Sequence, residues 1–302
     1  MYKNLNSSLR FVKRQVKLLS GIAAGLLIGG ASSAFVFAAV PSASGAVSLC
    51  YRTNGGQARV IDTATQSCNS NETLVAVDKA TPGNFVNNLV ESDFTGTSLA
   101  YRNFVGADLH GSLFDGPMNG SDFSNANLSS SSFIINQTIS LKKANFTSTN
   151  FSNSLLRYGS WFLNDATFLN SNFNGTTWDS LYADGGNFKG ASFTNANLES
   201  TSLVHSNFSN VDMRGAIFNN IHFISSDLTN ADFSNVTLQD GEVQGTIVDH
   251  TNFTNVHFNN QLLVGSNFST AILTGALWSN TICPDNTNSD NNGNTCIGHL
   301  VP

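Results

Sequence analysis

The sequence repeats with a period of five residues, and this period restricts the possible folds more than any other feature. From Phe168 to Cys283 a residue of the interior type, nearly always large and apolar, recurs at every fifth position in 24 consecutive units. Earlier blocks with the same spacing run from Leu89 to Phe114, from Phe123 to Phe133 and from Leu141 to Trp161. The chain therefore consists mainly of one short unit used many times.

Neither a regular helix nor a flat strand can bury residues that recur at this period. In an α-helix with 3.6 residues per turn, a step of five advances by about 140° beyond a full turn, which scatters the apolar residues around the axis. In a strand, every second one of them points to the opposite face. A backbone that bends by the same angle every five residues brings them all inside, and such coils must stack to shield one another. The sequence therefore predicts a solenoid.

The residues between the large positions fit this interpretation. A small residue (Ala, Ser, Thr, Gly or Val) stands two positions before 32 of the 38 large positions, and Gln261 is one of the six exceptions. Asn, Asp, Ser, Thr and Gly fill most of the remaining positions, and these residues favour repeated turns. We expect the three offsets between blocks, around Gly116-Pro117, Thr138 and Asn164, to be small bulges at corners of the coil.

Units such as Ala107-Asp108-Leu109 and Ala196-Asn197-Leu198 closely resemble those of the pentapeptide-repeat proteins, over about residues 87–283. The resemblance implies an all-β fold, a right-handed quadrilateral β-helix with four repeats per coil over residues 85–282. Residues 20 apart should then stack in the core. Two such columns can be read from the sequence: Phe193, Met213, Phe233, Phe253 and Leu273, and Leu198, Phe218, Leu238, Phe258 and Trp278.

Residues 1–46 have the pattern of an export signal or membrane anchor. Five of the 14 basic residues precede position 18, no acidic residue precedes Asp62, and residues 18–40 carry no charge. A basic stretch, an apolar stretch and then small residues are typical of a cleavable signal, although residues 18–40 are also long enough to span a membrane if they are not removed. Both interpretations place the rest of the chain outside the cytoplasm, secreted or at the cell surface.

The four cysteines form two local pairs, one at each end of the exported region. Outside the cytoplasm such pairs are expected to oxidise, and no zinc-type ligand spacing accompanies them. We therefore expect one disulfide in a small β cap over residues 47–84 and another in a cap over residues 283–302, joining Cys50 to Cys68 and Cys283 to Cys296. The N-terminal segment has an alternative interpretation as a small recognition module.

The C-terminal loop contains a partial calcium-binding pattern. Asn288, Asp290 and Asn292 precede Gly293 with the spacing that begins an EF-hand loop, but His299 stands where the closing Glu is required. A polar cap closed by the disulfide is the competing interpretation. Calcium is the only cofactor for which the sequence offers candidates.

Charge and motifs favour a non-catalytic protein. After the first 40 residues, 9 basic and 20 acidic side chains remain, a formal charge of −11, which disfavours binding to nucleic acid. The six histidines show no 20-residue spacing, and the sequence has no nucleophile motif or phosphate-binding loop. We therefore expect no enzymatic activity.

Three functional hypotheses follow. The first is an exported structural or interaction module that presents Asn-, Ser- and Thr-rich faces to a protein or cell-surface partner. The second comes from the resemblance, because some cytoplasmic members of that family imitate DNA and bind DNA gyrase, and beyond Lys189 this chain has nine acidic residues and one further basic residue, Arg214. The third is binding of ice or polysaccharide on the column Thr194, Arg214, Ser234, Thr254 and Thr274.

Overall fold

The computed structural model describes most of the chain after the N-terminal segment. The chain divides into two compact units, residues 1–36 and 37–302, and every described residue belongs to the second. The predicted export signal or anchor therefore lies outside the described residues. These are residues 47–52, 58–61, 66–77, 89–134 and 139–302.

The first described strands form an antiparallel group around β1 (Val47–Arg52). This strand pairs with β2 (Ala58–Ile61) on one side and with β3 (Glu72–Val77) on the other. A disulfide joins Cys50 of β1 to Cys68, as predicted. Because β2 also pairs in parallel with β4 (Asp93–Phe94), the antiparallel group continues into the sheet of the solenoid and pairs with its first edge.

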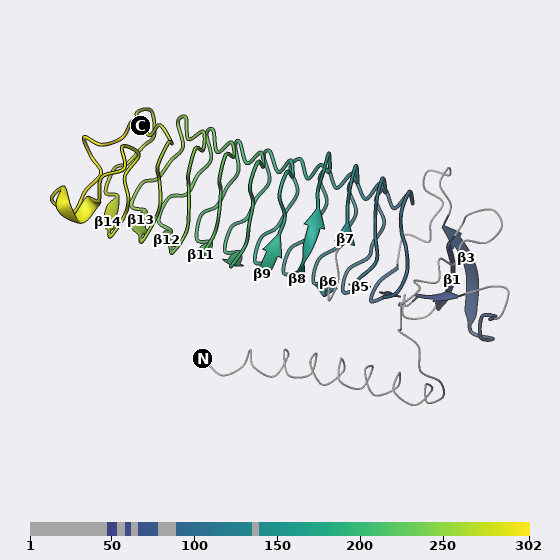
Figure 1. Cartoon of the computed structure of the whole chain (residues 1–302). Helices are drawn as coiled ribbons and strands as arrows, with labels where there is room; N and C mark the ends of the chain where they lie inside the picture. The colour runs from purple at the N-terminus through teal and green to yellow at the C-terminus, as the bar shows by residue number, and fades with distance from the viewer. Residues whose placement is uncertain (1–46, 53–57, 62–65, 78–88, 135–138) are drawn as a thin grey trace, which may run out of the picture. The chain divides into compact units, whose positions relative to one another are not determined.

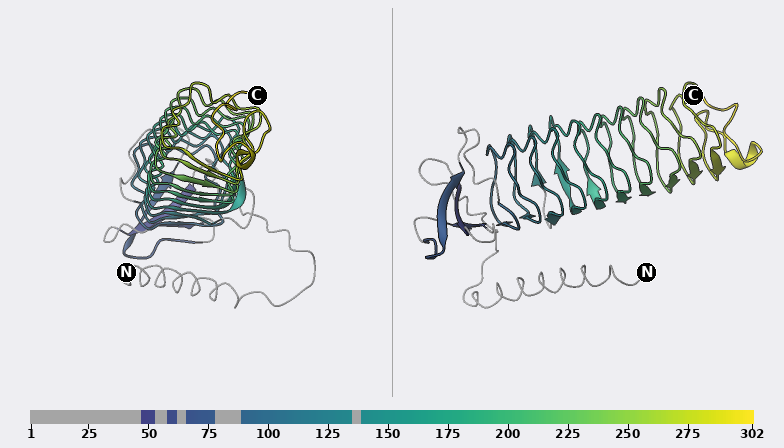
Figure 2. Two further views of the ribbon diagram at one scale, coloured as in Figure 1. Left: turned by 90° about the vertical axis from the view of Figure 1, so that its left-hand side faces the viewer. Right: turned by 180° about the vertical axis from the view of Figure 1, so that it is seen from behind.

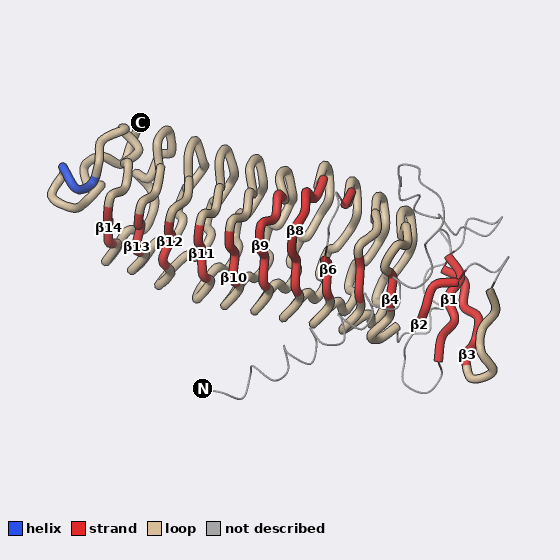
Figure 3. Tube along the Cα trace, turned by 60° about the horizontal axis from the view of Figure 1, so that its bottom comes forward, coloured by secondary structure: helices blue, strands red, loops and turns tan. Residues whose placement is uncertain are grey.

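The rest of the described chain is a β-solenoid, and its strands stack in parallel along one side of the coils (Figure 1). Figure 3 shows these strands in register, one per coil, with a 3-10 helix, η1 (Ser289–Asn291), at the C-terminal end. A further short strand, β7 (Ile139–Ser140), pairs with β8. The stacked strands after β4 are β5 (Leu113–Phe114), β6 (Ser132–Ile134), β8 (Leu155–Phe162), β9 (Thr177–Tyr182), β10 (Asn197–Glu199), β11 (Ile217–Asn219), β12 (Thr237–Gln239), β13 (His257–Asn259) and β14 (Leu277–Ser279).

Backbone hydrogen bonds hold each coil on the next at a spacing of four repeats. Phe188 N donates to Asn207 O at 2.7 Å, and Asn207 N donates to Gly186 O at 3.0 Å. Strand pairing places Leu198 beside Phe218, 20 residues later. The left view of Figure 2 shows successive coils overlying one another. The structure thus confirms an all-β solenoid in which four five-residue units complete one coil.

A left-handed residue turns the chain at the end of most units. Ala126 N donates to Phe123 O at 3.0 Å, and Asn125 between them has a φ of 59°. A positive φ at the third residue is the geometry of a type II turn, which favours Gly and Asn. The same position holds Asn153 and Gly175 in later coils, so the turns account for the Asn- and Gly-rich composition.

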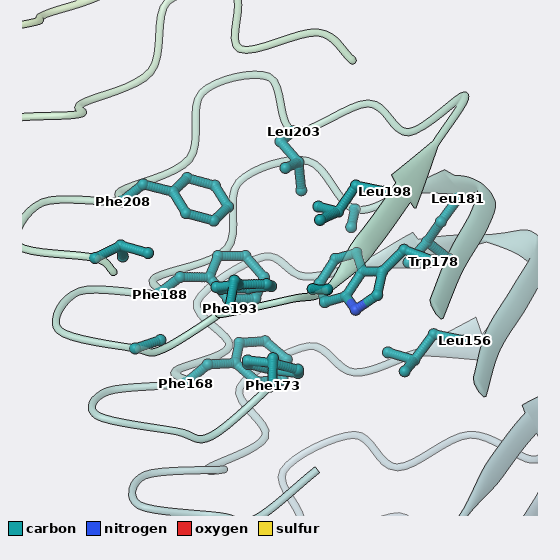
Figure 4. Close-up of a cluster of buried hydrophobic side chains, with 14 of the residues drawn as sticks. Leu156, Phe168, Phe173, Trp178, Leu181, Phe188, Phe193, Leu198, Leu203 and Phe208 are labelled. Atoms are coloured by element: carbon teal, nitrogen blue, oxygen red, sulfur yellow. The ribbon is translucent and has the colours of Figure 1, made fainter. Parts of the chain in front are cut away.

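The large residues of the repeats meet inside the coils as columns of stacked side chains (Figure 4). Phe188 lies between Phe168 and Phe208, with ring centroids 4.7 Å away on each side and nearly parallel planes. Phe173 and Phe193 stack in the neighbouring column at 4.6 Å. Parallel stacking of identical coils therefore places aromatic rings on aromatic rings through much of the interior.

Nine of the ten residues in the two columns read from the sequence are buried. The exception is Leu273, which is partly exposed although it packs against the core. It belongs to the last coil, where no complete further coil covers it. The nine buried residues are Phe193, Met213, Phe233, Phe253, Leu198, Phe218, Leu238, Phe258 and Trp278.

The three offsets of the repeat are coils of unusual length. Asn103 pairs with Asp122 across 19 residues, Asp122 with Asn145 across 23, and Asn145 with Thr167 across 22, after which the spacing is 20. In the 19-residue coil, a Cβ at Gly116 would lie only 1.9 Å from the Thr97 carbonyl oxygen, so only glycine fits there. The short coil therefore requires close backbone contact.

Two interior residues were missed by the sequence analysis because they lie beside these offsets. Met118 and Leu163 are buried at 1% and 0% exposure, and each precedes the next interior Phe by five residues. The offset expected near Asn164 lies instead at Trp161, which pairs across strands with Ile139 of β7. Trp161 thus lies in an inserted segment, but it stands five residues after Leu156 and so fits the spacing of the repeat.

We expect Phe188→Ala to lower the free energy of unfolding by about 3–5 kcal/mol, the usual cost of deleting a buried aromatic side chain. Phe188 is fully buried, and the variant removes its ring stacking on the coil before and the coil after. The measurement is the urea denaturation curve followed by circular dichroism. The neighbouring exposed Lys189→Ala is the control, and equal midpoints for the two variants would contradict the stacked core.

Candidate binding surfaces

The outside of the solenoid carries side-chain amides that are hydrogen-bonded from coil to coil. In the first such ladder, Asn127 donates to Asp108 at 2.9 Å, Asn150 donates to Asn127 at 3.1 Å, and Asn172 donates to Asn150 at 3.1 Å. These side chains are half-buried. Their positions are fixed by the same stacking that aligns the core.

Each side chain in this ladder also bonds to its own turn. The Asn127 side-chain oxygen accepts from Ser129 N at 3.2 Å, and the Asn150 oxygen accepts from Ser152 N at 3.1 Å. Bonds of this kind, from a side chain to the backbone two residues later, are typical of Asx turns. Since the amides are held from two directions, they form a preordered polar face for a partner.

A second ladder lies near the C-terminal end of the solenoid. Asn260 donates to Asp240 at 2.7 Å, Asn280 donates to Asn260 at 2.9 Å, and Asn288 donates to Asn280 at 3.2 Å. The hydrogen bond from Asn260, followed by one from Gln239, lowers the pKa of the Asp240 carboxyl. This ladder is therefore exposed and anionic at its first member.

The column considered for ice or polysaccharide binding is uneven in the structure. Ser234 is buried at 8% exposure, whereas the Arg214 side chain is 59% exposed and lies 2.7 Å from the Asp212 carboxylate. That hydrogen bond lowers the pKa of Asp212. The Thr254 hydroxyl donates to Asn252 at 2.7 Å. These residues therefore do not present the flat row of hydroxyls that the hypothesis requires.

The C-terminal segment closes the last coil through a disulfide and a carboxylate–histidine contact. The predicted disulfide joins Cys283 to Cys296, and both cysteines are fully buried. Asp285 accepts from the Thr287 hydroxyl at 2.6 Å, and its other oxygen lies 2.5 Å from His299 Nδ1. These contacts, Thr287 first and His299 second, lower the pKa of Asp285 to about 2.

The three calcium candidates make capping contacts in this segment. The Asn288 side chain accepts from Asp290 N at 2.8 Å and so caps η1, while Asp290 accepts from Asn280 N at 2.8 Å. Asn292 donates to the Thr287 hydroxyl at 2.7 Å. The structure thus assigns the three side chains a structural role in the cap. Calcium binding by this loop stays a prediction.

The histidines have separate partners. His110 contacts Asp108 at 2.9 Å, His222 lies 3.7 Å from Glu242, and His257 lies 2.9 Å from the Ser279 hydroxyl. No two of these contacts share a residue. The structure therefore does not gather the histidines into one centre.

Comparisons with known proteins agree with the repeat seen in the sequence and the structure. The family model described as pentapeptide repeats (8 copies) matches residues 187–220, 206–241, 216–255 and 251–276. These repeats, residues 187–276, belong to the pentapeptide-repeat family. No curated protein was found to match this pentapeptide-repeat protein significantly. No helix within its described ranges is long and apolar enough to cross a bilayer.

Several solved structures are similar to this pentapeptide-repeat protein. HetL, involved in heterocyst differentiation regulation in the cyanobacterium Nostoc sp. strain PCC 7120, is 20% identical with a TM-score of 0.48, covering 66% of this chain and 90% of HetL. Full-length QnrB1, a plasmid-mediated fluoroquinolone resistance protein, is 23% identical with a TM-score of 0.33, covering 57% and 84%. Rfr23 from the cyanobacterium Cyanothece 51142 is 20% identical with a TM-score of 0.30, covering 36% and 85%. With TM-scores below 0.5, the family assignment rests on the repeat model and the 20-residue register.

We expect acid to destabilise this pentapeptide-repeat protein partly through Asp285. Its pKa of about 2 in the folded chain lies below the ordinary 3.8, so its stabilising effect is complete above about pH 4 and is lost as the pH falls toward 2. Asp285→Asn should therefore lose less stability than the parent between about pH 5 and pH 2.5, as measured by urea denaturation at both values. Asp165→Asn, at an exposed turn, is the matched control and should follow the parent. Identical pH dependence in all three proteins would contradict the Asp285 contacts.

Proposed function

We propose that this protein is an exported, non-catalytic scaffold that binds a protein or cell-surface partner through its fixed polar faces. The observation that carries the proposal is the first amide ladder, Asp108, Asn127, Asn150 and Asn172, in which each side chain is hydrogen-bonded to the next coil. A partner that binds such a face does not have to order these side chains, which reduces the entropic cost of association.

The disulfides support the export part of the proposal. Both pairs are oxidised in the structure, and the described residues contain no free cysteine. Disulfides persist mainly outside the cytoplasm, where a basic and apolar N-terminal segment would direct the chain. Each disulfide lies at one end of the solenoid, where fewer neighbouring coils stabilise the chain.

The first test is a non-reducing intact-mass measurement on the protein isolated from separate fractions of its native host. We expect either a chain that begins between about residues 39 and 47 or a full-length chain in the membrane fraction, lighter by four hydrogens in both cases. A full-length, reduced chain in the cytoplasm would contradict the proposal.

The second test locates the binding face. We expect a photo-crosslinking amino acid at Ser152, beside the first ladder, to give a covalent adduct with one partner in envelope or extracellular material. The control places the same group at Tyr182, which is 60% exposed on a different side of the coil. Equal adducts from both positions, or no adduct from Ser152, would contradict binding through the ladder.

The DNA-mimic hypothesis remains a second candidate because of one observation, the acidic C-terminal half. Beyond Lys189 the chain has nine acidic residues and a single Arg, and that Arg214 is paired with Asp212. This candidate requires the reduced cytoplasmic chain as the result of the mass measurement. It also requires the purified protein to inhibit the supercoiling activity of DNA gyrase.

A further inference from the structure

Figure 3 shows β11–β14 as neighbouring strands of the solenoid. An open groove of about 520 Å³ is lined by residues that follow the ends of these strands. Its lining includes Asp240 and Asn260 of the second ladder, together with Gly241, Glu242 and Leu262. The groove therefore crosses several coils and is bordered by both polar and apolar side chains.

One residue departs from the interior pattern at this groove, and a glycine lies beside it in the preceding coil. Gly241 and Gln261 occupy the small inward position in successive coils, and Gln261 is one of the few large residues found there. The Gln261 side-chain oxygen lies 3.3 Å from the place where a Cβ of Gly241 would stand. A Cβ there would also lie 2.4 Å from the Ile221 carbonyl oxygen. The missing side chain at Gly241 thus makes room for the amide of Gln261.

The Gln261 amide has an unused hydrogen-bond acceptor. Its nitrogen donates to Asn259 O at 3.2 Å, but its buried side-chain oxygen has no hydrogen-bond partner. Gln261 is only 2% exposed and contributes to the lining of the groove. A buried acceptor without a donor is costly, so this oxygen favours a ligand that brings an N–H or O–H group into the groove.

The charges around the groove favour a cationic ligand. Asp240 and Glu242 contribute two carboxylates, and no Lys or Arg is among the lining residues. His222 also lines the groove, and its ring Nδ1 lies 3.7 Å from the Glu242 carboxylate. Hydrogen bonds from Asn260 and Gln239 lower the pKa of Asp240, so its negative charge is retained.

We propose that this groove binds the guanidinium group of an arginine side chain on a basic partner peptide. Arginine has five N–H donors in a planar fork, enough to bond a carboxylate of Asp240 or Glu242 and still reach the free oxygen of Gln261. Its methylene stem would pack against the half-buried Leu262 and Ile282. The inference goes beyond the proposed function, since it requires neither export nor the first amide ladder.

The test is fluorescence anisotropy with the full chain and a labelled pentapeptide that has a central arginine between serine and glycine residues. We expect saturable binding, and about tenfold weaker binding of the same peptide with citrulline, which keeps the shape but loses the charge. Equal binding of the two peptides, or no binding of the arginine peptide, would overturn the proposal. A lysine peptide that binds as well as the arginine peptide would overturn recognition of the planar fork.

Variants then locate the site. Glu242→Gln and Gln261→Met nearly preserve side-chain size and should each weaken arginine-peptide binding by about tenfold. Glu199→Gln removes an exposed carboxylate on β10 and should leave binding unchanged. Gly241→Ala should abolish binding, and a melting curve shows whether that variant still folds. If both Glu242→Gln and Gln261→Met bind like the parent, the groove is not the site, whatever the result with Gly241→Ala.

Discussion

Parallel backbone hydrogen bonding between successive coils is the interaction on which the rest of this structure depends. It places each residue beside its counterpart one coil away, which is 20 residues later in the regular coils and 19, 23 or 22 later at the three offsets, so residues that recur once per coil form a column in space. Inside the coils the consequence is the face-to-face stacking of Phe168, Phe188 and Phe208. Outside them it is the amide ladder through Asn127, Asn150 and Asn172. One register thus produces both the core and the candidate binding face.

Buried polar side chains at the small inward positions are hydrogen-bonded to the backbone of neighbouring coils. Ser92, Ser112, Ser131 and Ser154 form a fully buried column in which the backbone N–H of each of the first three donates to the hydroxyl of the next. Because these hydroxyls are satisfied, the polar column costs little. The same column becomes apolar from Ala196 onward, where the small side chain needs no partner. Gln261, in another column, does not follow this rule, since its oxygen lacks a donor.

The groove proposed to bind arginine lies where the regular pattern is broken. Arg214 interrupts a column of hydroxyl side chains and pairs with Asp212. Gln261 interrupts the small inward positions, and with Gly241 it lines a groove that also holds two acidic residues. A perfectly regular solenoid would offer the same surface at every coil, so a specific site requires such departures. The amide ladders supply a broad polar face, whereas the groove supplies a local, charged one.

The sequence by itself determined the solenoid and most interior residues, because a strict five-residue period leaves the backbone few alternatives. The two local cysteine pairs indicated both disulfides, and the resemblance to the pentapeptide-repeat proteins implied the 20-residue coil. The sequence also placed the offsets of the register correctly to within a few residues, but it passed over two interior residues beside them. Met118 follows a coil that is one residue short, and Leu163 follows an inserted segment whose own apolar residue, Trp161, fits the five-residue spacing. Only the tertiary structure decided that the side-chain oxygen of Gln261 turns toward Gly241 and lacks a donor. The 20-residue register places the two residues in adjacent coils, but the direction of the amide depends on side-chain packing that no period in the sequence encodes.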